Sequence, residues 1–182
     1  NQGALFGDEV LAANHVLLQL VTLSAYLLDG YAHATEILVG RAVGAADRPA
    51  FDQAVRSATE LAAGTAVVLA IAVLVFGPWA IVALTDLEPV RAVAARFLPL
   101  TALYVLLSFA AFQLDGILIG ATATRAMRNA SVGSFCLFFA LSLVLSERAG
   151  NSGLWWAFAG YVVARALSLG LGYPRLRDSI GG

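Results

Sequence analysis

Three ionisable side chains, Asp29, His33 and Glu36, lie inside a long apolar run of the sequence. On a helix this spacing places each of them one turn from the next. Two carboxylates and an imidazole can together hold a proton or a small cation. An ionisable group at membrane depth costs about 3 kcal/mol, so it is normally kept for a pathway or a binding site. We therefore predict a proton- or cation-coupling site here. The alternative is that these groups pair with arginines of other helices and only hold a bundle together.

The three residues belong to a longer polar stripe on a helix expected from about residue 10 to 43. Steps of four and three residues join its eight members: His15, Gln19, Thr22, Tyr26, Asp29, His33, Glu36 and Gly40. Such steps keep all of them on one helical face, while Leu, Val, Ile and Ala fill the other faces. We expect the stripe to line a wet cavity inside a membrane protein, with Gln19, Thr22, Tyr26 and His33 among the residues that contact substrate.

A second deep carboxylate, Asp115, lies on a stripe of its own. Polar residues recur there every seven positions, and Tyr104 shares their face: Thr101, Ser108, Asp115, Thr122 and Asn129. We expect Asp115 to take part in ion coupling, and Tyr104, Ser108 and Phe112 to line the cavity. A plain hydrogen bond between helices is the alternative for Asp115.

Two further features of the sequence concern helix packing around these carboxylates. Gly116 and Gly120 form a Gly-xxx-Gly step, which permits close approach of two helices. Arg165 falls near the middle of the last apolar span. It either extends toward the membrane surface or pairs with a carboxylate such as Glu60 or Asp115, and the sequence leaves this choice open.

The composition indicates an integral membrane protein. The chain has 182 residues, of which 60% are hydrophobic and 13% charged, whereas soluble domains are about half apolar and about a quarter charged. A net charge of −1 argues against nucleic-acid binding. No His/Cys set has metal-ligand spacing, and no phosphate loop or nucleophile motif supports an enzyme. The single cysteine, Cys136, is expected to be buried within an apolar run.

Five membrane spans are expected, over about residues 10–43, 55–84, 90–124, 131–146 and 154–173. Arginines concentrate on one side of such an arrangement: Arg41, Arg48, Arg56, Arg125, Arg128, Arg175 and Arg177. The positive-inside rule places that side in the cytoplasm, so the N-terminus is expected outside and the C-terminus inside. An outside N-terminus is natural if at least one helix precedes it, and we expect the chain to be part of a longer protein.

Several runs of residues resemble one transporter family. Leu28-Asp29-Gly30-Tyr31-Ala32, with Glu36 and Gly40-Arg41-Ala42-Val43-Gly44-Ala45, resembles the eighth helix of the multidrug and toxic-compound extrusion family. Leu114-Asp115-Gly116-Ile117, with Met127-Arg128-Asn129, is similar to its tenth helix, and Gly153-Leu154-Trp155 with Ala164-Arg165 to its last helix. The resemblance covers nearly the whole chain and is nearest to the DNA-damage-inducible protein F branch.

The resemblance implies an all-α fold in which residues 1–182 form part of a C-terminal six-helix lobe, helices eight to twelve of a twelve-helix, two-lobe transporter. It implies export of organic cations and amphiphilic drugs across the bacterial cytoplasmic (inner) membrane in exchange for H⁺ or Na⁺, with no other cofactor. Asp115 matches the tenth-helix acid that contributes to the cation site in the sodium-linked branch, and Asp29 and Glu36 fit the branch pattern. The implied partners are membrane lipid, a small amphiphilic substrate, and the missing N-terminal lobe and preceding helix.

Two other functions remain open at this point. A flippase for lipid-linked sugars belongs to the same superfamily, but its cavity should be rich in arginine, whereas the deep residues here are mostly acidic. A membrane scaffold or assembly subunit that transports nothing would use the two stripes only to bind helices to each other. Neutral substitutions of Asp29 and Asp115 would then weaken the fold without a specific loss of ion response.

Overall fold

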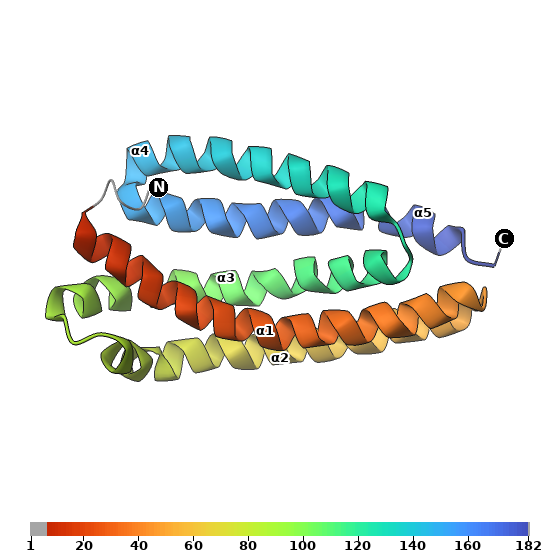
Figure 1. Ribbon diagram of the computed structural model, residues 1–182, viewed down its shortest axis with the longest axis horizontal. Coiled ribbons are helices and arrows are strands. Elements are labelled where there is room, and N and C mark those ends of the chain that lie inside the picture. The colour runs from red at the N-terminus through yellow and green to blue at the C-terminus, as the bar shows by residue number, and fades with distance from the viewer. Residues whose placement is uncertain (1–6, 182) are drawn as a thin grey trace.

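The computed structural model describes residues 7–181 and consists of helices (Figure 1). Four of them are long, and a short fifth follows: α1 Asp8–Gly44, α2 Arg48–Leu84, α3 Glu88–Gly120, α4 Thr124–Gly170 and α5 Tyr173–Asp178. The described chain has four helical stretches that are long and apolar enough to cross a membrane. Residues 1–6 of the polar segment that precedes the first span lie outside the described residues. The expected all-α membrane architecture is therefore confirmed.

The longest helix, α4, folds back on itself at Gly150. The backbone there has φ 57° and ψ −136°, far from helical values, and Figure 1 shows the two arms of α4 side by side. A methyl group at Gly153 would collide with the Leu145 carbonyl oxygen of the opposite arm. The left-handed turn and the close contact thus both require glycine. The expected fourth and fifth spans occupy the two arms of this one helical stretch.

Helix α2 begins earlier than the sequence pattern predicts. Its first residue is Arg48 rather than one near position 55, because the Asp47 carboxylate accepts a hydrogen bond of 3.0 Å from the Ala50 amide and caps the helix. Pro49 lies in the first turn, where a proline removes no helical hydrogen bond. Pro78 and Pro99 lie inside α2 and α3, and both helices continue past them.

The predicted seven-residue stripe of the third span ends at Asp115. Helix α3 stops at Gly120 rather than near position 124, so Thr122 lies in a turn with φ 56° and Asn129 lies on α4. These two residues therefore do not share a face with Asp115, and that part of the prediction is wrong. The sequence periodicity continues past Gly120, whereas the helix ends there.

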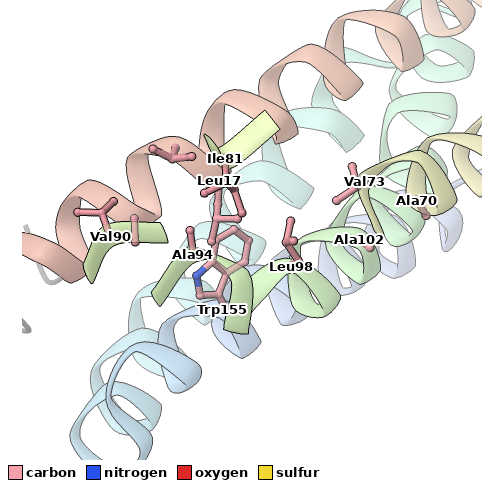
Figure 2. Packing of buried hydrophobic residues seen from close by; sticks show 11 residues of the cluster. Leu17, Ala70, Val73, Ile81, Val90, Ala94, Leu98, Ala102 and Trp155 are labelled. Carbon is pink, nitrogen blue, oxygen red and sulfur yellow. The ribbon is translucent and has the colours of Figure 1, made fainter. Parts of the chain in front are cut away.

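A hydrophobic cluster joins the four long helices near the end where α1 begins (Figure 2). Leu17 of α1, Ile81 of α2, Leu98 of α3 and Trp155 of α4 are all buried in it. Trp155 also makes a polar contact at the border of this cluster: its Nε1 donates a hydrogen bond of 3.0 Å to Asn14 Oδ1. Asn14 and Asn151 exchange two more, of 2.7 and 3.0 Å. The second arm of α4 is thereby fixed to α1.

The single cysteine is exposed, so the prediction that Cys136 is buried is wrong. Its neighbours Phe135 and Leu137 are exposed as well. In a chain that spans a membrane, apolar side chains face lipid as readily as they face protein. An apolar run therefore does not imply burial inside the chain.

Helices α1 and α3 approach most closely beside the polar stripe, as the Gly-xxx-Gly step predicts. A methyl group at Gly116 would collide with the Ala32 carbonyl oxygen, and one at Gly120 would lie 2.5 Å from the carbonyl oxygen of Glu36. In the same interface Gln113 Nε2 donates a hydrogen bond of 3.0 Å to Thr35 Oγ1. The glycines thus bring the α1 residues from 29 to 36 next to Asp115.

Gly116→Ala is expected to destabilise the protein by about 2 kcal/mol, since the added methyl group forces two helix backbones apart. The midpoint of thermal unfolding in detergent measures the effect. Gly133→Ala is the matched control, because a methyl group there has no neighbour within 4 Å. Equal unfolding midpoints for the two variants would show that the close contact contributes nothing.

Candidate functional site

Asp115 of α3 is ion-paired with Arg165 of α4. Arg165 Nε lies 3.1 Å from Asp115 Oδ2, and its Nη2 lies 2.9 Å from each carboxylate oxygen. Arg165 Nη1 donates a further hydrogen bond of 2.8 Å to Ser131 Oγ in the other arm of α4. The two side chains are only 17% and 21% exposed for Arg165 and Asp115. The choice that the sequence left open is thus settled: Arg165 pairs with Asp115 and not with Glu60.

Asp29, His33 and Glu36 form a row along α1, as their spacing predicts. His33 Nε2 lies 3.2 Å from Asp29 Oδ2, and His33 Nδ1 lies 3.5 Å from Glu36 Oε2. Each ring nitrogen thus faces a carboxylate. A doubly protonated imidazolium can donate to both carboxylates, whereas a neutral ring can donate to only one. His33 is 68% exposed, so the row is accessible from outside the described chain.

A cavity of about 240 Å³ brings the predicted coupling residues together. Its wall contains three carboxylates, one imidazole and one guanidinium: Asp29, His33, Glu36, Asp115 and Arg165. Phe112, Gly116 and Met127 also line this cavity. Since a water occupies about 30 Å³, the space admits several waters or a small cation. Within residues 7–181, no three or more His, Cys, Asp and Glu side chains are arranged to hold a metal ion.

A second cavity, of about 260 Å³, is lined by the same ion pair together with Tyr104, Ser108 and Phe112. Ser108 Oγ donates to the Val105 carbonyl oxygen at 2.8 Å, so its proton is already engaged. Tyr104 packs edge-on against Phe158, with 6.1 Å between the ring centroids. Asp115 and Arg165 therefore border two cavities, and the three α3 residues predicted to line the site all lie on the second.

The remaining members of the α1 stripe lie apart from the acidic cavity. Gln19, Thr22 and Tyr26 are exposed on the surface of the described chain, Tyr26 to 73%. Gln19 Nε2 lies 3.3 Å from the ring of His15, and Thr22 donates to the Leu18 carbonyl oxygen at 2.8 Å. The structure thus brings Asp29, His33, Glu36 and Asp115 together and leaves Gln19, Thr22 and Tyr26 on an open face.

Ser131, which accepts a hydrogen bond from the guanidinium of Arg165, was not predicted from the sequence. For Arg165 itself, Glu60 and Asp115 were left open as possible partners. The available signal was the position of Arg165 inside an apolar span, since a deep charge requires an opposite charge nearby. Choosing among the acids required the helix arrangement. The helices place Arg165 beside α3, whereas Glu60 forms an exposed pair with Arg56 on α2.

Comparison with known proteins agrees with this structure. Residues 3–144 match the family model described as MatE. The chain is also 35% identical over 167 residues to the DNA damage-inducible protein F of Escherichia coli (strain K12). That similarity covers 92% of this chain but 36% of the relative, so the chain spans little more than a third of the length of the protein it matches. The chain therefore belongs to the MatE family, the multidrug and toxic-compound extrusion family of multi-pass membrane transporters, which are not enzymes.

Proposed function

We propose that this chain is the greater part of the C-terminal lobe of a secondary antiporter that exports amphiphilic organic cations in exchange for H⁺ or Na⁺. The observation that carries the proposal is the shared cavity of Asp29, Glu36 and Asp115 in a chain of this family. These carboxylates come from two helices, and their convergence concentrates negative charge at membrane depth. Convergent acids of this kind suit the binding of an ion or of a cationic substrate.

Exchange follows from competition for these carboxylates. A proton or Na⁺ that binds in the cavity lowers its negative charge, and an organic cation then binds less tightly. The coupling is reciprocal, so the substrate must weaken ion binding by the same factor. Tyr26, Tyr104 and Phe112 supply apolar contact for a lipophilic cation, and an aromatic face also attracts positive charge.

The membrane topology is part of the same proposal. Each arm of α4 crosses the membrane once, which makes five crossings with the three preceding helices and puts the two ends on opposite sides. The arginines at the ends of the helices support a cytoplasmic C-terminal end, and the membrane that we propose is the bacterial inner membrane. The ordered reversal at Gly150 supports two separate crossings within α4.

The open polar face of α1 supports a second lobe opposite this one. At membrane depth, exposed polar groups such as Gln19 and Tyr26 require water or protein around them. The matched relative is nearly three times as long as the aligned part, which leaves ample chain for an N-terminal lobe. In this proposal the two lobes face each other across a water-filled path lined by the α1 stripe.

Efflux measurements on the full-length parent protein test the proposed function. Inside-out membrane vesicles containing it are supplied with ethidium, a fluorescent lipophilic cation, under an imposed proton gradient and then under a sodium gradient. Accumulation of ethidium that follows one gradient and stops when that gradient is collapsed is the expected result. If ethidium does not move under either gradient, the chain belongs to a scaffold or to a carrier of another substrate class, and the proposal fails.

A further inference from the structure

Arg165 donates hydrogen bonds to both oxygens of the one carboxylate that α3 contributes to the acidic cavity. Both oxygens of Asp115 receive hydrogen bonds from it, at 2.9 to 3.1 Å. The third nitrogen of the guanidinium is held by Ser131 at 2.8 Å, so contacts on two sides fix its position. The planar fork of arginine matches a carboxylate in this two-point geometry and binds it more strongly than a single point charge does.

The positive charge beside Asp115 is permanent, because a guanidinium in a protein does not lose its proton. A small inorganic cation at the same place needs several oxygen ligands, with the carboxylate among them. Such an ion would have to displace Arg165 from Asp115 or else sit beside a full positive charge. Both alternatives weaken its binding.

Resting on the antiporter function proposed above, we propose that Arg165 is a specificity-determining residue that takes the place of an inorganic cation at Asp115. While Arg165 is paired, Asp115 binds no Na⁺. A proton or an organic cation that engages Asp115 does so in competition with the guanidinium. Asp29 and Glu36 line the same cavity and are the alternative partners for a released Arg165.

The test is Na⁺ binding to the purified full-length transporter in detergent at pH 8, without substrate or gradient. The midpoint of thermal unfolding is measured as NaCl replaces N-methylglucamine chloride at constant ionic strength, since an ion that binds the native state raises the midpoint. In Arg165→Gln we expect a new, saturable rise of the unfolding midpoint with Na⁺ that the wild type lacks at Asp115. The apparent dissociation constant for Na⁺ should therefore be at least roughly tenfold lower than any value that Asp115 of the wild type could have. The response should be absent from Arg165→Gln/Asp115→Asn and from Arg165→Lys.

Arg56→Gln is the matched control, because it removes an arginine from an exposed pair with Glu60, 2.8 Å away, outside the cavity. It should leave the Na⁺ response unchanged. The proposal is overturned if folded Arg165→Gln gains no Na⁺ response. It is equally overturned if the wild type has a Na⁺ response that Asp115→Asn removes, a result that does not depend on how well the Arg165 variants fold. The expected result is that the wild type shows either no Na⁺ response or a response that is the same in Asp115→Asn.

Failure of this inference and failure of the proposed function give different results. Transport plays no part in the Na⁺ titration, so loss of ethidium movement under both gradients would overturn the antiporter and leave the titration readable. Conversely, ethidium can move with a gradient while Arg165→Gln gains no Na⁺ binding. The antiporter function would then stand, and only the proposed role of Arg165 would be wrong.

Discussion

Asp115→Asn in the full-length transporter is expected to reduce gradient-driven ethidium transport by roughly tenfold or more. A loss of only about 1.4 kcal/mol of transition-state stabilisation produces a tenfold lower rate. The amide has nearly the same shape as the carboxylate, but it carries no charge and exchanges no proton at this position. The initial rate of transport in vesicles, divided by the amount of transporter, measures the effect.

Two variants separate this loss from a failure to fold. Glu60→Gln neutralises an exposed carboxylate outside the acidic cavity and should leave the rate unchanged. Asp115→Asn/Arg165→Gln removes both charges of the deep pair, so it should be more stable than either single variant yet still inactive. If Asp115→Asn transports at the wild-type rate, Asp115 only joins helices and its assignment to the coupling site is wrong.

Arg165→Gln alone is expected to lower the free energy of unfolding by about 3 kcal/mol, because it leaves an unpaired carboxylate in a mostly buried position. The additional change Asp115→Asn should recover most of this loss, since an amide needs no counter-charge. Chemical unfolding in detergent measures both variants, and the difference between single and double changes isolates the pair.

The comparison for this second effect is Arg56→Gln, which breaks an ion pair whose side chains are largely exposed. Exposed pairs contribute little to stability, because water and salt screen their charges. Equal destabilisation by Arg165→Gln and Arg56→Gln would mean that water reaches the deep pair freely. The same outcome would weaken the argument that Arg165 keeps inorganic cations from Asp115.

Local features of the site were predictable from the sequence, whereas contacts between helices were not. The row of Asp29, His33 and Glu36 follows from helical spacing alone, and the structure confirms it. The pairing of Asp115 with Arg165 joins residues 50 positions apart and depends on how α3 and α4 pack. Periodicity within one helix contains no information about that packing.

The errors in the sequence interpretation have two physical causes. The first is that periodicity does not mark helix ends: the turn at Thr122 and the cap at Asp47 set the ends of α3 and α2. The second is that burial cannot be read from hydrophobicity in a membrane chain, where Cys136 and the apolar residues around it face outward. The reversal of α4 falls between the expected spans 131–146 and 154–173, and the structure makes it with a single left-handed glycine, Gly150.

The most direct test of ion–substrate coupling is the affinity of the purified full-length transporter for tetraphenylphosphonium, measured over a range of pH and of Na⁺ concentration. The wild-type affinity for tetraphenylphosphonium is expected to fall as the concentration of one of the two ions rises. Coupling between sites typically corresponds to a factor of roughly 5 to 150. If that ion is the proton, the same titration of Asp115→Asn should show a much weaker dependence on pH. A wild-type affinity that stays constant against both ions would contradict the account, because the carboxylates of the cavity would then couple nothing.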